Sequence, residues 1–315
     1  MKSREIDLSR VRTYPLAARP SKVVAQALGR PLPAGASVTD LLASLPDLLA
    51  ARDLRAAASE LARRRRDGGA IVLGMGAHPI KVGLSPLIVD LIEHGVLAAV
   101  AMNGAGIVHD FELALAGGTS EEVADHLADG TFGMAAETGR FLNEAARDGA
   151  DAGMGLGEAV GRKILADGLP HASLSILAAG ARGAVPVTVH VAIGTDIVHM
   201  HPSADGAAIG ETSLRDFRIL AEQVGALQNG AFVNLGSAVI LPEVFLKALS
   251  LARNVGHDVS DLFTLDMDFN RHYRPLTNVV SRPTSLGGRG MHLTGHHEIM
   301  FPLLCAALRE AMENP

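Results

Sequence analysis

The stretch AMNGAGIVHDFELAL, residues 101–115, joins a run of small apolar residues to a glycine-rich bend and an acidic helix. The segment VLAAVAM (96–102) predicts a short buried strand, and Gly104 and Gly106 allow a backbone or a ligand to approach closely. His109 and two acidic residues follow, where we expect the first turn of a helix, because the helix dipole favours acidic side chains there. The stretch therefore predicts a strand–loop–helix unit whose loop can face a ligand.

The same alternation of apolar strands and helices runs from Gly69 to the end of the chain. Besides the strand just described, we expect strands at AIVLGMG (70–76), VPVTVHVAIG (185–194), GAFVNLGSAV (230–239), DLFTLDMDF (261–269) and LTNVVSRP (276–283). Strands separated by helices imply right-handed crossovers, so the sequence predicts an α/β fold with a parallel sheet and helices on both faces. In such sheets ligands bind beyond the carboxyl ends of the strands.

The first part of the chain has a different pattern. Residues 14–35 are rich in Pro and Arg and predict an extended arm, and a helical periodicity follows up to the run of arginines at 63–66. We therefore predict an N-terminal arm and helix over residues 1–66 and one large domain over residues 67–315.

Composition excludes several classes of protein. Apolar residues make up 48% of the chain but aromatic residues only 3%, so Ala, Val, Leu and Ile must build the core. The net charge of −6 argues against a nucleic-acid surface. The sequence contains a single cysteine, Cys305, so no disulfide can form within the chain, and we expect this side chain to be buried. No apolar run is long enough to span a membrane and the N-terminus lacks an apolar signal core, so we expect a cytoplasmic protein.

Four glycine-bearing loops are expected at strand ends. They are GMGAHPIKVG (74–83), NGAGIVHD (103–110), AIGTDIVHMHPSADG (192–206) and NLGSAV (234–239). None has the strict G-x-G-x-x-G spacing, but a dinucleotide lies across several such loops, and their recurrence indicates a dinucleotide site.

The chain contains 13 histidines, several of them near the expected strand ends. In an extended HMH, His199 and His201 would share one face, a spacing that suits a metal ion. The segment GHHE adds His296 and His297. The alternative is that these are ordinary loop and core residues. Imidazole exchanges protons near neutral pH, so the cluster is also a candidate acid–base site.

Three cationic residues are candidates for substrate or cofactor binding. Lys81 lies beside the first loop and could pair with a phosphate or form an imine, or could simply be solvated. Arg282 and Arg289 lie in SRPTSLGGRG, expected near the end of the last strand, and could grip a carboxylate or a phosphate or serve solubility.

From about residue 11 to 310, the order of motifs resembles the deoxyhypusine synthase family. The resemblance is carried by VRTY, VLGMGAHPIKVGLSPLIVDLIEHGVLAAVAMNGAGIVHDFELAL, VPVTVHVAIGTDI, LGSAVILPEVFLKALSL and HEIMFPLLCAAL. It implies a Rossmann-like fold that binds NAD, with NADP as an alternative, and homotetramers built as dimers of dimers. The residues that would then lie in the cofactor loops are Gly76, Ala77, His78, Asn103, Gly104, Ala105, Gly106, Gly194, Asp196, Gly236 and Ser237.

The chain departs from that family where its lysine chemistry takes place. The segment NVVSRPTSLGGRGMHLTGHHEIMFP (278–302) contains no Lys and no Trp, and the position of the family's catalytic histidine reads Pro242-Glu243. His109 and His199 stand where the family has amine-binding acidic residues. Since carboxylates hold ammonium groups, these replacements predict an uncharged or anionic substrate and argue against deoxyhypusine synthesis.

The sequence thus predicts an NAD-binding enzyme that transfers a hydride on a small polar or anionic molecule. The candidate catalytic residues are His109, His199 and Glu243, and the candidate substrate-binding residues are Lys81, Arg282, Arg289 and His296. One alternative is a metal-dependent hydrolase or lyase that uses His199 and His201. Another is a non-catalytic nucleotide-binding protein.

Overall fold

The structure is a computed structural model that describes residues 3–313. By its internal contacts the chain divides into two compact units, one up to Arg52 and one from Asp53 onward. This division falls within helix α2 (Leu49–Arg66), whose last residue coincides with the end of the predicted N-terminal segment. The domain boundary at 66/67 itself stays a prediction.

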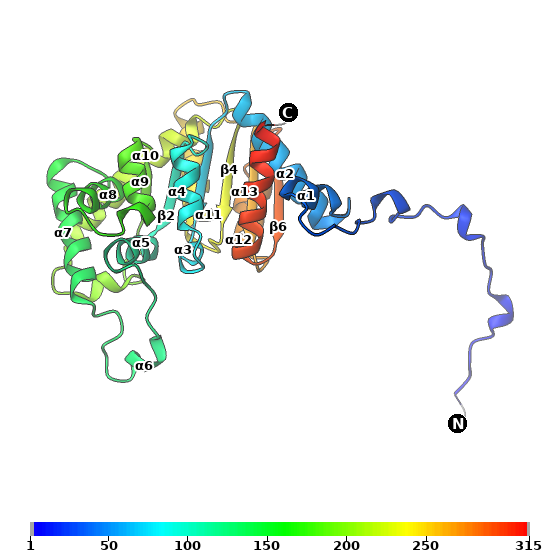
Figure 1. Cartoon of the computed structure of the whole chain (residues 1–315), viewed down its shortest axis with the longest axis horizontal. Coiled ribbons are helices and arrows are strands. Elements are labelled where there is room, and N and C mark those ends of the chain that lie inside the picture. Colours follow the sequence, from blue (N-terminus) through cyan, green and yellow to red (C-terminus); the bar gives the residue numbers. More distant parts are fainter. Residues whose placement is uncertain (1–2, 314–315) are drawn as a thin grey trace. The chain divides into compact units, whose positions relative to one another are not determined.

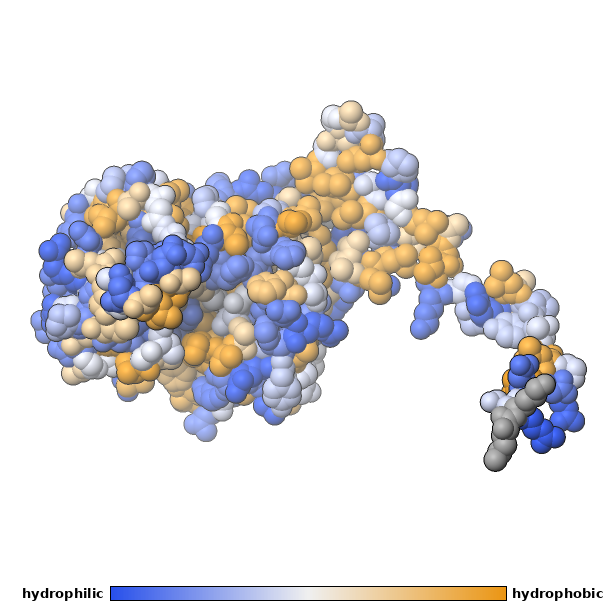
Figure 2. Space-filling view, turned by 90° about the horizontal axis from the view of Figure 1, so that it is seen from below, coloured by the Kyte–Doolittle hydropathy of each residue, from blue (hydrophilic) through white to orange (hydrophobic). Residues whose placement is uncertain are grey.

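The first unit is an arm followed by a short helix. Every residue from Ser3 to Gln26 is exposed, and the arm forms only isolated turns of 3-10 helix, η1 (Leu8–Arg10), η2 (Leu16–Ala18) and η3 (Ala25–Ala27). Apolar side chains lie uncovered along it (Figure 2). Helix α1 (Val38–Ser44) begins with a capping box, because Ser37 and Asp40 each bond the other's backbone N–H.

The second unit is built around six parallel strands in the order β3-β2-β1-β4-β5-β6 (Figure 1). The strands are β1 (Ile71–Met75), β2 (Ala99–Asn103), β3 (Val187–His190), β4 (Gly230–Leu235), β5 (Leu262–Asp268) and β6 (Arg289–Thr294). Five of the six are at the predicted places, and the predicted α/β class with a parallel sheet is confirmed. The central strands are fully buried, as expected for a sheet covered on both faces.

Helices cover both faces of this sheet (Figure 1). On one face α10 (Gly206–Gly225) and α11 (Ile240–Asn254) bury Phe232 of β4, whose ring stacks on Phe245 at 3.7 Å between centroids. On the other face α2, α4 (Ser85–Glu93) and α13 (His297–Glu313) pack on β1 and β4. Burying one such aromatic side chain contributes roughly 1.5–3 kcal/mol, so these contacts hold the central strands in place.

Most of the remaining helices extend the fold around β2 and β3, whereas α12 (Tyr273–Pro275) and the π-helix η6 (Leu276–Ser281) lie beside β5 and β6. The others are α3 (His78–Lys81), α5 (Gly104–Ala116), α6 (Val123–Leu127), α7 (Ala136–Ala152), α8 (Leu156–Ala166), η4 (Ala172–Leu174), α9 (Ile176–Gly183) and η5 (Ile197–Met200). Asp110 of α5 accepts hydrogen bonds from Ser175 Oγ and Ile176 N at the start of α9, and burial raises its pKa to about 6. It therefore holds α9 and is not part of a site.

Two sequence predictions are wrong in detail. The segment 276–283 is not a strand but the π-helix η6, whose Val279 packs into the core, and the sixth strand lies later, at 289–294. The second error concerns α5, which begins at Gly104 because Asn103 caps it, so His109 lies in its second turn and no acidic residue lies in its first. Within residues 3–313, none of the helices has both the length and the apolar character of a membrane span.

Glycine at the start of α8 decides how closely that helix lies on edge strand β3. A Cβ at Gly157 would lie 1.8 Å from the carbonyl oxygen of Val187, whereas a Cβ at Gly210 in α10 would meet nothing within 4 Å. We expect Gly157→Ala to lower the free energy of unfolding by about 1–3 kcal/mol or more. Gly210→Ala should raise it by roughly 0.5–1 kcal/mol. Urea unfolding of both variants measures this, and equal midpoints would contradict the packing of α8.

Candidate functional site

The carboxyl ends of all six strands lie at one edge of the sheet, because the strands are parallel. The loops after β1, β2, β3 and β4 therefore neighbour one another, and these are the four loops that the sequence singled out. The strand order reverses between β1 and β4, where α/β sheets open a crevice for dinucleotides.

The glycines of these loops face protein atoms. A Cβ at Gly76 would lie 2.4 Å from the carbonyl oxygen of Gly236, and one at Gly104 would lie 1.9 Å from Asp196 Oδ2. Gly236 has φ +64°, and a Cβ there would lie 2.6 Å from the His297 ring. The sequence predicted that a ligand approaches these glycines closely, but other residues of the protein occupy that space. These positions therefore need glycine for packing.

A cavity of about 210 Å³ opens at this edge beside β2 and β3. Four of the predicted site residues line it, namely Lys81 of α3, Ala105 and His109 of α5, and Asp196 of the loop after β3. We call this cavity the rim pocket. Its other lining residues are Val108, Glu112, Ser120, Glu121, Val123, Phe132, Thr195 and Ile197.

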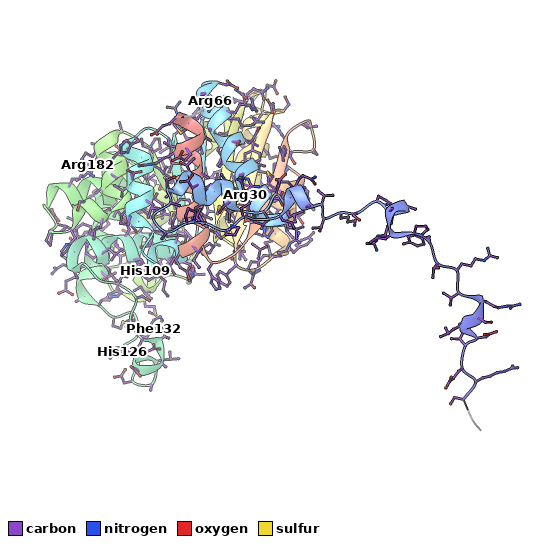
Figure 3. The ribbon with its side chains drawn as sticks, turned by 45° about the vertical axis from the view of Figure 1, so that its right-hand side comes forward. Arg30, Arg66, His109, His126, Phe132 and Arg182 are labelled. Carbon is purple, nitrogen blue, oxygen red and sulfur yellow. The ribbon has the colours of Figure 1, made fainter. Side chains whose placement is uncertain are left out.

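One side of the rim pocket is formed by the excursion, residues 117–135, which joins α5 to α7 and contains α6. Figure 3 shows His109 at the base of this segment and Phe132 and His126 out along it. Glu121 Oε1 accepts a hydrogen bond from Gly133 N at 2.9 Å, which ties the two arms of the excursion together. Its Phe132, next to Gly133, is one of the lining residues of the pocket.

A chain of hydrogen bonds orients the His109 ring. Thr119 Oγ1 lies 2.7 Å from His109 Nδ1 and donates to Glu112 Oε2 at 2.5 Å. Glu112 also accepts from Thr138 Oγ1 at 3.1 Å. Because the Thr119 hydroxyl gives its one proton to Glu112, its oxygen must accept the proton of His109 Nδ1. This assigns the tautomer and leaves Nε2 as the basic nitrogen of His109.

Burial sets the charge states in the rim pocket. It lowers the pKa of His109, the positive charge of Lys81 lowers it further, and Glu112 opposes both. Burial raises the pKa of Asp196, against the influence of nearby His199. Asp196 Oδ2 has no hydrogen-bond partner among residues 3–313. The rim pocket is thus lined both by His109, whose imidazole is neutral, and by Asp196, whose Oδ2 makes no hydrogen bond among the described residues.

A second group of predicted residues gathers at the ends of β1, β5 and β6. The ring of His78 lies 5.5 Å from that of Phe269 and 5.3 Å from that of His297, and His296 stacks on Phe269 at 6.3 Å. His297 is buried, and burial lowers its pKa despite the nearby carboxylate of Asp268. Neither ring nitrogen of His297 makes a hydrogen bond within the described part of the chain.

The structure separates the other candidates from these two groups. Glu243 is held by Lys247, by Asn278 at 2.9 Å and by Arg274 at 3.3 Å, and the Lys247 hydrogen bond is the main cause that lowers its pKa. Its contacts are those of a surface ion-pair network. Ser237 Oγ accepts from Leu241 N at 3.1 Å and so serves the start of α11.

The two arginines do not reach the carboxyl edge of the sheet in the way predicted. Arg289 begins β6 and pairs with Phe263 near the start of β5, so it lies at the amino edge. Arg282 bonds Asn278 Oδ1 at 2.9 Å and precedes that strand. The prediction placed them after the last strand because it mistook η6 for that strand.

The HMH segment is not extended. His199 lies in the 3-10 helix η5, accepts a hydrogen bond from Gly194 N at Nδ1, and has Nε2 3.9 Å from Asp196. His201 Nε2 lies 2.8 Å from the carbonyl oxygen of Gly133. No group of three or more metal-ligating side chains occurs among residues 3–313.

Sequence reasoning missed Glu112, Thr119 and Phe132 as site residues. Glu112 had a signal, since it lies three residues after His109 and so one helical turn away. Thr119 had none, because it reaches His109 only after the chain turns back at Gly117, which ends α5 with φ +69°. Phe132 comes from the far arm of the excursion and could be placed only from the structure.

No protein-family model matches this chain, and no curated protein matches it. Several solved structures do match it. A protein from Methanococcus maripaludis assigned to the LOR/SDH type has a TM-score of 0.53 and 16% identity, covering 82% of this chain and 67% of its own. A protein from Entamoeba histolytica assigned as a deoxyhypusine synthase has a TM-score of 0.53 and 14% identity, covering 89% and 95%.

AgrE, solved as a ternary complex with ornithine and NAD+, has a TM-score of 0.53 and 16% identity over 84% of this chain. The present chain spans only 34% of the length of AgrE. At these identities the likeness establishes the fold, which is similar to that of deoxyhypusine synthase-like and LOR/SDH-like structures.

The raised pKa of Asp196 leads to a prediction about the pH dependence of stability. Since its folded-state pKa is raised, the folded protein binds this proton more tightly than the unfolded chain does. Stability should fall as pH rises from the unfolded pKa through the folded one. Asp196→Asn should remove this loss, so that the variant exceeds the wild type in unfolding free energy at pH 7 and matches it near pH 3.5.

Urea unfolding at several pH values measures the difference. Asp205→Asn is the matched control, because Asp205 accepts hydrogen bonds from the backbone N–H groups of Ala207 and Ala208 at an exposed helix start. A variant at position 196 that is less stable than the wild type at pH 7 would show that the carboxylate is stabilised there.

Proposed function

We propose that this protein is an NAD-binding enzyme that transfers a hydride between the cofactor and a small polar substrate held in the rim pocket. The observation that carries the proposal is the hydrogen-bond chain from Glu112 through Thr119 to His109, which fixes a neutral imidazole with a basic nitrogen in a cavity. The strand order and the likeness to AgrE, whose structure contains NAD+, support the cofactor.

The edge of the sheet has groups that fit a dinucleotide. The first N–H groups of α5 have no acceptor within the helix, and Asn103 caps only that of Gly106, so the N–H of Ala105 suits a phosphate oxygen of the cofactor. Two buried side chains with unpaired polar atoms flank the β1/β4 reversal, Asp196 on the β3 side and His297 on the β6 side. Such atoms suit ribose and amide groups. Bound NAD would accept the hydride.

His109 would act as the base. Its Nε2 takes the proton of the substrate hydroxyl or amine, and the imidazolium that forms is stabilised through Thr119 by the carboxylate of Glu112. Burial favours the neutral ring before the reaction, which keeps the base available at neutral pH. Phe132 and Val123 of the excursion give the pocket an apolar part of its lining, which disfavours water there.

The charge of the rim pocket bears on the substrate. The expectation of an uncharged or anionic substrate rested on His109 and His199 in place of acidic residues and on the added charge of Arg282 and Arg289, and the two arginines lie elsewhere. The pocket is lined by three carboxylates, Glu112, Glu121 and Asp196, against one ammonium group, that of Lys81. Since like charges repel most strongly away from bulk water, we propose a polar substrate that carries a positive group rather than an anion.

A search for NADH formation tests this function. The purified protein is incubated with NAD or with NADP and with sets of small amino and hydroxy compounds, and absorbance of the reduced cofactor is followed. We expect one substrate class to give turnover and His109→Asn to lower kcat about 100-fold or more, because it removes the base. His94→Asn, at the exposed end of α4, is the matched control and should keep full activity.

Calorimetric titration of NAD separates this function from its main alternative. A non-catalytic nucleotide-binding protein would bind NAD with no turnover, and His109→Asn would then change nothing measurable. Absence of NAD and NADP binding at millimolar concentration would refute the proposal altogether.

The two charges beside His109 should move its pKa in opposite directions. Lys81 lowers that pKa and Glu112 raises it. A base must be neutral, so kcat/KM falls as pH drops through the pKa of His109. Lys81→Met should shift this acid limb to higher pH and Glu112→Gln should shift it to lower pH. The pH profiles of both variants measure the shifts, and movement in the same direction would contradict the assignment of His109 as the base.

A further inference from the structure

Three side chains on β5 and the edge strand β6 form a hydrogen-bonded series that is separate from the rim pocket. The ring of His292 in β6 places Nε2 2.8 Å from Thr294 Oγ1 and Nδ1 2.7 Å from Asp266 Oδ2 of β5. The series therefore runs from a hydroxyl through an imidazole to a carboxylate.

The burial of these groups is graded from the inside outward. Asp266 is fully buried, and its other oxygen accepts a hydrogen bond from Asn234 Nδ2 at 2.7 Å. The side chain of His292 is 8% exposed, and Thr294 is exposed. The carboxylate can only accept, so His292 Nδ1 carries the proton and Nε2 is left to accept the hydroxyl proton of Thr294.

The register of the sheet produces this arrangement. Asp266 pairs with His292 across two parallel strands, and Thr294 lies two residues further along β6, so all three side chains share one face. Asp266 is already satisfied by Asn234 and His292, and water could satisfy an exposed hydroxyl. The contact between Thr294 and the imidazole is therefore not required to pair the buried carboxylate of Asp266.

We propose that Thr294 is the nucleophile of a second active site, which accepts acyl groups from small activated esters and releases them to water. A hydroxyl within hydrogen-bond reach of a base that a third group orients is the arrangement of activated nucleophiles. Thr294 and His292 are the catalytic residues, and Asp266 and Asn234 are positioning residues.

The reaction balances with water as the only co-reactant. Thr294 Oγ1 attacks the ester carbonyl and passes its proton to His292 Nε2, the bond from the carbonyl carbon to the alcohol oxygen breaks, and His292 returns the proton to the departing alcohol. Water, deprotonated by the same nitrogen, then cleaves the acyl–Thr294 ester and regenerates the hydroxyl. The first N–H groups of the 17-residue helix α13, which starts three residues after Thr294, can stabilise the oxyanion.

The test uses the full-length protein and 4-nitrophenyl acetate. We expect a burst of nitrophenol equal to the protein concentration and one acetyl group on the peptide that contains Thr294, found by mass spectrometry. Thr294→Val should lower the burst rate about 100-fold or more, and Thr294→Ser should keep it. His292→Asn, which retains a donor to Asp266, should also lose the burst. His94→Asn removes an exposed imidazole outside the series and should behave as wild type.

Two results would overturn the proposal. One is a burst that survives in Thr294→Val, or an acetyl group found only on other side chains. The other is a folded wild-type protein, checked by circular dichroism, that shows no burst. None of the rim-pocket residues takes part in this series, so His109→Asn should leave the burst unchanged whether or not the protein oxidises a substrate with NAD.

Discussion

Parallel hydrogen bonding of β1 to β2 on one side and to β4 on the other is the constraint on which the rest of the molecule depends. It brings the carboxyl ends of strands that are far apart in sequence to one edge, and it places the change of direction in strand order at the centre of the sheet. The loop after β3 can then pack against the first turn of α5, where Gly104 leaves room for the carboxylate of Asp196. Without glycine there, this wall of the rim pocket could not form.

Asp196 and His297 bury polar atoms at this edge without hydrogen-bond partners in the described part of the chain. Asp196 Oδ2 and both ring nitrogens of His297 make no hydrogen bond among residues 3–313. Such atoms also occur elsewhere in the fold, as at Thr264 Oγ1, whereas Asp110 is fully paired at the start of α9. A buried polar group without a hydrogen bond costs on the order of 1–3 kcal/mol. Because Asp196 lines the rim pocket and His297 lies beside the β1/β4 reversal, a ligand bound there can offset that cost.

The sequence predicted the parallel sheet because its buried strands are short apolar runs separated by helical segments, and β1, β2 and β4 are each followed directly by glycine. It failed at η6 and β6, since Val279 and Val280 have strand propensity while the edge strand RGMHLT is half-exposed and shows no apolar run. The candidate site was predicted in part. His109 and Asp196 lie in the segments that come after β2 and β3, but Thr119 and Phe132 come from the excursion, whose return path no local pattern encodes.

The two hydrogen-bonded series in this protein contain the same three chemical groups in different order, and the order decides what each can do. In the rim pocket the Thr119 hydroxyl lies between Glu112 and His109, so its proton is committed to the carboxylate and the free imidazole nitrogen is the reactive end. At β6 the imidazole of His292 lies between Asp266 and the hydroxyl of Thr294, so the reactive end is the hydroxyl oxygen. The first order makes a base that takes a proton from a bound molecule, whereas the second makes a nucleophile that bonds to one. Because the β5–β6 register fixes the second order and the excursion fixes the first, a change that loosens the excursion should affect only the base.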